Sequence, residues 1–259
     1  MEDFGSGLSS FLSAHQEKIS GIINGLDTIR WDPATDNKIM VNFSVDKIIK
    51  RSANKSFLQE AMGLLNDAEI PLLAMVTRMD PQKGVDLAVS AIRSILKSST
   101  SSTTSLQAVF LGKGGPILEK SVRQLEKDFP NQLRARIMYD ERLSHHIYAG
   151  ADAFLMPSRY EPCGLSQMIA MHYGCVPIAR ATGGLSDTIH DPASSGNATG
   201  FLFPHPKPAE LAKTIQRALE IYFHDPQAWQ EIQINGMRQD FSWNRSAEEY
   251  LKRYKMILR

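Results

Sequence analysis

The chain has 259 residues, 42% of them hydrophobic and 22% charged, which is enough for one large α/β domain or two small ones. Its formal net charge is +1, so charge alone indicates neither nucleic acid nor an anionic membrane as a partner, although a local basic cluster could still bind a small anion. The two cysteines, Cys163 and Cys175, provide neither a disulfide framework nor a metal site, which is typical of a reducing compartment.

The first 65 residues are expected to be largely irregular. Residues 19–23 predict a short strand and residues 57–62 a helix, whereas the run Trp31-Asp32-Pro33-Ala34-Thr35-Asp36 has the composition of a turn. A segment with so little regular structure buries too little apolar surface to fold alone. We therefore predict a connector that is supported by another part of the protein.

From about residue 70 onward, short apolar runs alternate with amphipathic stretches. Strands are expected at 71–78, 106–112, 134–139, 153–158 and 176–180, and helices between them at 85–96, 116–129, 143–149 and 165–173. Because the strand runs are continuously apolar, helices should cover both faces of the sheet. This order predicts an α/β fold with a Rossmann-like, doubly wound parallel sheet.

Three closing helices are expected at 208–223, 227–237 and 243–258, and the Ser/Thr run at 98–105 predicts a mobile surface loop. No apolar run approaches the roughly 20 residues that cross a bilayer, and the N-terminus lacks the basic start and apolar run of a signal or transit peptide. We expect a cytosolic protein, with the plastid as the alternative if the source is a plant or an alga.

Ligands of open α/β sheets bind beyond the carboxyl ends of the strands, and two basic loops occupy that position. Arg78 and Lys83 bracket a tight turn after the first strand, where a guanidinium and an ammonium could converge on one anion. The alternative is two solvated cations in a polar loop. The turn Gly112-Lys113-Gly114-Gly115-Pro116 follows the second strand and would let backbone approach a ligand. It lacks the third glycine of the dinucleotide fingerprint, so a turn without a ligand is the alternative there.

Two later strands also end in candidate ligand contacts. Tyr139 could stack on a purine or be only a half-buried aromatic. The loop at 158–167 leads into a helix, so its amides around Gly164 could bind an anion. Because a phosphate would repel the carboxylate of Glu161 unless that group binds sugar hydroxyls, the loop predicts a sugar attached to a phosphate. The turn Ala181-Thr182-Gly183-Gly184-Leu185 could add further amides.

No metal site is expected, because the adjacent His145 and His146 point in different directions on a helix. These residues alone support a phosphate-plus-sugar ligand on an α/β sheet. They do not define a reaction.

A set of motifs in this order resembles the glycogen/starch synthase family of retaining glycosyltransferases, which have the two-domain GT-B fold. The most diagnostic run is Glu161-Pro162-Cys163-Gly164-Leu165-Ser166-Gln167-Met168. The other motifs are Tyr173-Gly174, Thr182-Gly183-Gly184-Leu185-Ser186-Asp187-Thr188, Asp80-Pro81-Gln82-Lys83-Gly84, Asn24-Gly25-Leu26-Asp27, Trp31-Asp32-Pro33-Ala34-Thr35-Asp36 and Asp240-Phe241-Ser242-Trp243. The resemblance covers essentially the whole chain.

The resemblance implies that this chain is the nucleotide-sugar-binding half of such an enzyme. The family transfers glucose from ADP-glucose, or from UDP-glucose in some members, to the non-reducing end of an α-1,4-glucan with retention of configuration. It implies that Arg78 and Lys83 hold the donor's diphosphate, that Glu161 contacts the transferred glucose and that Tyr139 lies against the adenine. The other residues implied to bind substrate are Asn24, Cys163, Gly164, Leu165, Thr182 and Gly183. No cofactor or metal is implied, because the two cations can neutralise the leaving diphosphate.

The sequence departs from the family at its beginning. Full-length members start with a second Rossmann-like domain that carries a Lys-x-Gly-Gly-Leu loop and a catalytic-region histidine, and neither is found here. We therefore expect residues 1–65 to be the tail of that domain and a linker, 66–240 the nucleotide-sugar-binding domain and 241–259 a crossover helix. Alone, the chain is expected to have little or no synthase activity and to bind ADP weakly.

Two other functions stay open at this point. One is a catalytically inactive nucleotide-sugar-binding or interaction module, and a separate chain supplying the Lys-x-Gly-Gly-Leu loop would distinguish it from half of an enzyme. The other is a nicotinamide dehydrogenase, which the missing fingerprint at 112–116 disfavours. ADP-glucose is the donor that we favour over UDP-glucose, with an α-1,4-glucan as acceptor.

Overall fold

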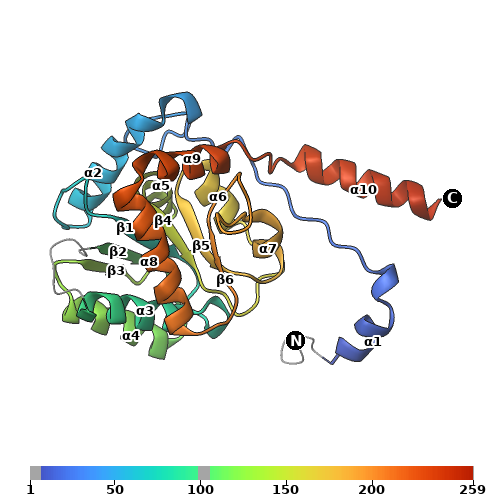
Figure 1. Cartoon of the computed structure of the whole chain (residues 1–259), viewed down its shortest axis with the longest axis horizontal. Coiled ribbons are helices and arrows are strands. Elements are labelled where there is room, and N and C mark those ends of the chain that lie inside the picture. The colour runs from blue at the N-terminus through green and yellow to red at the C-terminus, as the bar shows by residue number, and fades with distance from the viewer. Residues whose placement is uncertain (1–6, 99–105, 259) are drawn as a thin grey trace.

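The structure is a computed structural model that describes residues 7–98 and 106–258, so most of the expected Ser/Thr loop lies outside it. Within the described residues, six strands form one all-parallel sheet in the order β3-β2-β1-β4-β5-β6 (Figure 1). The strands are β1 Leu72–Val76, β2 Gln107–Leu111, β3 Leu133–Arg136, β4 Ala153–Met156, β5 Val176–Arg180 and β6 Phe201–Phe203. This is the strand order of a Rossmann sheet, so the expected α/β fold is confirmed.

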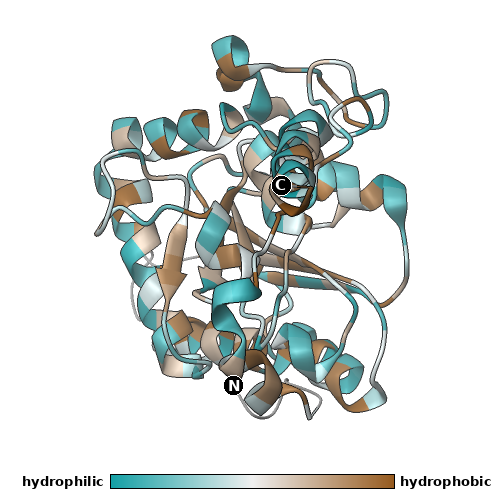
Figure 2. Cartoon of the chain, turned by 90° about the vertical axis from the view of Figure 1, so that its right-hand side faces the viewer, coloured by the Kyte–Doolittle hydropathy of each residue, from teal (hydrophilic) through white to brown (hydrophobic). Residues whose placement is uncertain are grey.

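Both faces of the sheet are buried, as the continuous apolar runs predict. Along β1, Leu73 and Met75 belong to one hydrophobic core, while Leu72 and Ala74 belong to the other. Successive side chains of a strand point to opposite faces, so a strand between two cores must be apolar at every position. The strands are accordingly brown at the centre of Figure 2, and the helices around them carry both colours.

The core around Leu73 and Met75 is covered by three long amphipathic helices. They are α3 Val85–Ser98, α4 Pro116–Asp128 and α8 Pro208–His224. Proline occupies the first turn of α4 and of α8, where its missing N–H costs no hydrogen bond. Trp229 and Ile232 of α9, which spans Pro226–Met237, extend the same core.

The opposite core is covered by α2 Arg51–Ala61, α5 Glu141–Gly150 and α6 Ser166–His172, with the short α7 Gly184–Thr188 beside them. The connector contributes apolar side chains to this core as well, among them Leu26, Phe43 and Leu58. Residues 26–65 therefore pack on the sheet. Among the described residues, no helix is both long and apolar enough to cross a membrane.

The chain enters and leaves this body at one crossing point. The Leu26 amide donates to the Phe241 carbonyl at 2.6 Å, and the Ser246 hydroxyl donates to the Ile23 carbonyl at 2.8 Å. A Cβ on Gly25 would overlap the backbone and ring of Trp243, so only glycine allows this close approach.

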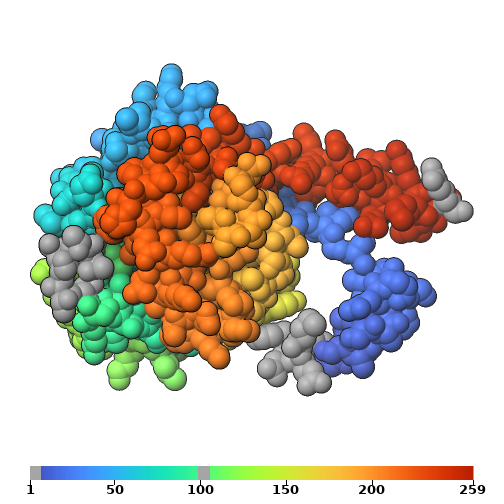
Figure 3. Space-filling model, in the orientation of Figure 1, coloured from blue at the N-terminus to red at the C-terminus, as the bar shows by residue number. Residues whose placement is uncertain are grey.

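Beyond the crossing, α10 Trp243–Ile257 and α1 Ser9–Ala14 project from the body (Figures 1 and 3). Only Ser246 of α10 is buried, while Trp243, Leu251 and Tyr254 are each more than half exposed. Figure 3 shows an open space between the two projecting helices and the body. A helix with this much exposed apolar surface lacks a packing partner within the described residues.

Several expectations need correction. The strand expected at 19–23 is wrong, because this segment pairs with no strand of the sheet. The helix expected at 57–62 is the second half of α2, and its first half follows a 3-10 helix, Val45–Lys50. The closing strand β6 was not expected, since three residues are too few to show a pattern.

Candidate functional site

The carboxyl ends of β1, β2 and β4 meet at the point where the strand order reverses. β1 lies between β2 and β4, and the helices that follow β1 and β4 cover opposite faces of the sheet. Such a switch point leaves a crevice above the sheet, which is where open α/β sheets bind ligands. The loops that the sequence indicated at the ends of these strands therefore gather around one region.

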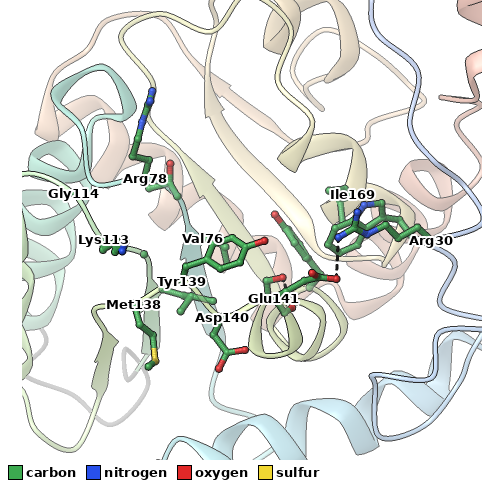
Figure 4. Close-up of a pocket in the computed structure, with 16 residues that line it drawn as sticks. Arg30, Val76, Arg78, Lys113, Gly114, Met138, Tyr139, Asp140, Glu141 and Ile169 are labelled. Atoms are coloured by element: carbon green, nitrogen blue, oxygen red, sulfur yellow. Dashed lines mark hydrogen bonds and ion pairs between the residues drawn. The ribbon is translucent and has the colours of Figure 1, made fainter.

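A cavity of about 630 Å³ opens there, within the size range of small-molecule sites. Figure 4 shows Arg78, Lys113 and Gly114 on one side of it, Arg30, Glu141 and Ile169 on the other, and Val76 and Tyr139 between them. The remaining lining residues are Trp31, Thr77, Leu111, Gly112, Met138, Asp140, Ser144 and Tyr148. The cavity thus has a cationic end and a broad apolar and aromatic middle.

Arg78 is the exposed cation at one end of this cavity. It follows β1, and the structure records no ion pair for its guanidinium among the described residues. Lys113, on the neighbouring glycine turn, is exposed on the same side. Two unpaired cations at the mouth of a cavity provide a binding site for an anion.

Lys83 and Glu161 meet beside the cavity. The Lys83 ammonium lies 2.6 Å from Oε2 of Glu161, and the buried Ser158 hydroxyl donates to the same oxygen at 3.2 Å. The Glu161 side chain is only 8% exposed, whereas that of Lys83 is 22% exposed. Val76 and Thr77 line both the cavity and the recess beside Lys83, so the two lie next to each other. The sequence predicted that Lys83 and Glu161 contact the same ligand but did not predict this direct ion pair between them.

The glycine turn before α7 packs directly against Glu161. Gly183 has a φ of 47°, and a Cβ at this position would overlap the Glu161 carbonyl oxygen. The Gly184 amide donates to that oxygen at 3.1 Å, which fixes the backbone that carries the carboxylate. Thr182 lies half-buried at the start of the same turn. The sequence therefore named two loops that do lie together.

Four other predicted residues lie in or next to the loop that follows β4. The Asn24 amide is 3.4 Å from the Cys163 sulfur, which brings the connector against this loop. Gly164 has a φ of 75°, and Leu165 is 46% exposed immediately before α6. The Asn24 side chain is exposed.

Tyr139 was expected to be the last residue of a strand at 134–139, but it lies three residues beyond the end of β3. β3 ends at Arg136, which pairs with Leu111, the last residue of β2. Residues 137–139 therefore form a loop, because no partner strand continues beside them. Tyr139 is 78% exposed and lines the cavity, so the correction leaves it available to a ligand.

A buried network that the sequence did not reveal supports the wall of the cavity. Nδ1 of His145 lies 2.6 Å from Oδ2 of Asp36, which also accepts the hydroxyl of Tyr173 at 2.7 Å. The His145 ring stacks on Trp31 with centroids 4.1 Å apart and planes 11° from parallel. Trp31 was noted only as part of a turn motif, because its partner lies more than a hundred residues away in the chain.

The polar rim beside Trp31 is held by Glu141. Its carboxylate pairs with Arg30 at 2.9 Å and with Lys38, and hydrogen bonds from Lys38 and Arg30 lower the pKa of Glu141 to about 2. The carboxylate is therefore ionised at neutral pH and can only accept hydrogen bonds. The sequence shows basic residues on either side of the turn at 31–36 and an acidic residue at the start of α5. Only the tertiary structure shows that these residues contact one another.

His145 should make the protein sensitive to mild acid. Burial lowers its pKa, although the hydrogen bond and charge of Asp36 act in the opposite direction, and Lys38 and Glu141 also face the ring. Lys38 contacts Nε2 at 3.3 Å, so a neutral ring that donates from Nδ1 to Asp36 satisfies both nitrogens.

We expect the melting temperature to fall as the pH is lowered below about 6.5, because the unfolded chain then binds protons that the folded chain resists. His146 and His172 act in the same direction, since burial lowers their pKa as well. A His145→Gln variant should therefore show a shallower decrease in melting temperature between pH 7.5 and 5.5. Equal slopes for variant and wild type would contradict this role of His145.

Comparison with known proteins gives one family and a consistent set of relatives. A family model described as glycosyl transferases group 1 matches residues 62–235. A glycogen synthase of Anaeromyxobacter sp. is 42% identical over 98% of this chain, and glycogen synthase 2 of Nitrosococcus oceani is 43% identical over 99%. Both alignments cover 52% of the relative, so the chain spans about half the length of the curated relatives it matches.

Solved structures give the same picture. The catalytic domain of starch synthase IV from Arabidopsis thaliana, bound to ADP and acarbose, superposes with a TM-score of 0.88 at 36% identity. The superposition covers 99% of this chain and 52% of that one.

Proposed function

The chain belongs to the group 1 glycosyl transferases, and from that membership we propose that it is the donor-binding half of a glycogen or starch synthase. The enzyme would transfer glucose from ADP-glucose, or from UDP-glucose, to the non-reducing end of an α-1,4-glucan with retention of configuration. The observation that carries this proposal is the contact between Lys83 and Glu161, which unites a cation and a carboxylate at the carboxyl ends of β1 and β4. A donor with a diphosphate next to a hexose needs these two groups side by side.

In this proposal Arg78 and Lys83 bind the diphosphate. The unpaired guanidinium of Arg78 can hold two phosphate oxygens, and the ammonium of Lys83 supplies a point charge. When the glycosidic bond breaks, negative charge develops on the leaving diphosphate, and both cations are already placed to neutralise it. Loss of one such preorganised donor typically costs ~10²–10³ in rate.

Glu161 would then accept hydrogen bonds from the hydroxyls of the transferred glucose. On donor binding, Lys83 would turn from the Glu161 carboxylate toward the diphosphate, while the Ser158 hydroxyl and the Gly184 amide keep Glu161 in place. Asn24, Cys163, Gly164, Leu165, Thr182 and Gly183 would complete the sugar side of the site, since they surround the same loop. These roles rest on position and on the family's pattern.

The base would occupy the aromatic middle of the cavity, against Tyr139. This ring is 78% exposed and lies between the cationic end and the rim formed by Arg30 and Glu141. The starch synthase IV structure that this chain resembles was solved with ADP. We therefore favour adenine as the base and ADP-glucose as the donor.

The acceptor side would be supplied by a second domain, on this chain or on a separate one. The relatives are about twice as long as the aligned region, and α10 exposes an apolar face without a partner among the described residues. In this proposal residues 1–65 are the tail of that second domain and a linker, 66–240 the donor-binding domain and 241–259 a crossover helix. The chain alone would have little synthase activity. Its two unpaired cysteines fit the cytosol or a plastid.

The test is calorimetric titration of the chain with ADP and with UDP, repeated with Arg78→Ala and Lys83→Ala. We expect ADP to bind more tightly than UDP, and each substitution to weaken binding by about tenfold or more, as for loss of a charge-assisted hydrogen bond. Asp128→Ala, at the last residue of α4 and outside the cavity lining, is the control and should bind like the wild type. Unchanged affinity in both cationic variants would refute the diphosphate assignment.

A further inference from the structure

Arg159 joins the loop after β4 to the loop after β1. Its Nη1 and Nη2 donate to the two carboxylate oxygens of Asp86, at 2.8 and 2.6 Å, and Nη1 also donates to the Pro81 carbonyl at 2.7 Å. Its backbone amide donates to the Gln82 carbonyl at 2.7 Å. One residue therefore contacts the other loop at several points on either side of Lys83.

These contacts flank the Lys83–Glu161 pair closely in the chain. Lys83 follows Gln82 directly and Asp86 is three residues further on, while Glu161 is two residues after Arg159. A second cross-loop bond runs from the Gln82 side-chain amide to the Tyr160 carbonyl at 2.9 Å. The Arg159–Asp86 pair and its neighbours therefore connect the two backbone segments that carry Lys83 and Glu161.

Arg159 is itself held from a third direction. Arg180, the last residue of β5, donates to the Ser158 carbonyl at 2.7 Å and to the Arg159 carbonyl. Neither Arg159 nor Asp86 lines the cavity. We therefore expect them to affect a ligand through the loops that they connect.

We infer that Arg159 and Asp86 are positioning residues, whose two-pronged ion pair sets the spacing of Lys83 and Glu161 for a nucleoside diphosphate hexose. We call this ion pair the Arg159–Asp86 clamp. The inference rests on the proposed function, because it places the clamp beside the same donor site. A guanidinium presents two parallel N–H groups to a carboxylate, which a lysine cannot do, so Arg159→Lys keeps the charge but loses the geometry.

The fold contains a matched pair away from this site. Arg217 of α8 donates to Asp191 with the same two distances, 2.8 and 2.6 Å, and this pair joins α8 to the segment before β6. Neither residue lines the cavity or the recess of Lys83. Arg217→Lys therefore breaks an ion pair of the same geometry, although with a more buried aspartate, without touching the two loops.

The experiment is calorimetric titration of the chain with ADP-glucose in Arg159→Lys, Asp86→Asn, their double variant and Arg217→Lys. Each of the first two should bind about tenfold more weakly, within the range of couplings measured for residues of one network. The double variant should lose no more than either single one, because both substitutions break the same contact. Arg217→Lys should lower the melting temperature and leave the affinity unchanged.

The outcomes separate this inference from the proposed function. If Lys83→Ala loses binding but Arg159→Lys binds like the wild type, the clamp is refuted and the donor site stands. If Arg217→Lys weakens binding as much as Arg159→Lys, or if the losses in the double variant add, the effect is one of general stability and the inference also fails. If the wild-type chain binds neither ADP-glucose nor ADP nor UDP, both proposals fail together.

Discussion

Replacing Gly112 with alanine is expected to destabilise the protein by about 3 kcal/mol, since the change adds backbone strain to overpacking. Gly112 has a φ of 152°, and a Cβ on it would overlap the carbonyl oxygen of Thr77, which belongs to the backbone and cannot rotate away. At this point the Gly112 amide donates to Arg136 and the Thr77 amide donates to Leu111, each at 3.0 Å. The clash would therefore be transmitted to β1, β2 and β3 together.

The Gly112→Ala substitution should weaken ADP binding as clearly as it lowers the free energy of unfolding. Thr77 and Gly112 both line the cavity, and Arg78 follows Thr77 directly. Urea unfolding measures the loss in free energy, and titration with ADP measures the loss of the site. Gly115→Ala in the same turn is the control, because its Cβ would lie 3.5 Å from the Met79 carbonyl oxygen, an ordinary contact. Equal stability of the two variants would contradict the steric argument.

Asp152→Ala is expected to cost about 3–5 kcal/mol, because it leaves buried cations without their counter-ion. Oδ2 of Asp152 accepts the Lys55 ammonium at 2.8 Å and the Leu72 amide at 2.8 Å, and Oδ1 lies 3.9 Å from the guanidinium of Arg51. The three charged side chains are less than 10% exposed. This cluster of three side chains connects α2 to the amino ends of β1 and β4.

An exposed ion pair provides the comparison. Arg93 and Asp128 connect α3 to α4 with side chains that are each 30% exposed. Solvent screens such a pair, so Asp128→Ala should leave the melting temperature close to that of the wild type. A similar loss in both variants would show that burial is not what makes the Asp152 cluster important.

The sheet could be predicted because each strand is an apolar run bounded by polar loops. Four of the five expected strands coincide with observed ones to within two residues at each end, and the fifth, at 134–139, was extended too far because Ile137 and Met138 are apolar. Its true end is set by the length of β2 alongside it, which is a tertiary constraint. The strand β6 was not predicted because three residues are too few to show an apolar run. It is recognised as a strand only by its pairing with β5.

The site could be predicted only in part, for a similar reason. Strand ends and glycine turns identified the loops that carry Arg78, Lys83, Glu161 and Gly183, because the topology of a parallel sheet brings such loops to one edge. The stacking of Trp31 on His145, by contrast, joins the connector to a helix far away in the chain. No local sequence pattern predicts such a contact.

The crossing of the two chain segments at Gly25 and Trp243 determines how an attached body is connected to the sheet. The two segments meet at this crossing through two hydrogen bonds, from the Leu26 amide to the Phe241 carbonyl and from the Ser246 hydroxyl to the Ile23 carbonyl, and Gly25 has no side chain to hold them apart. A body attached to α10, or to the chain before residue 20, would be joined to the sheet by these few contacts, so we expect its orientation to change by bending at this crossing.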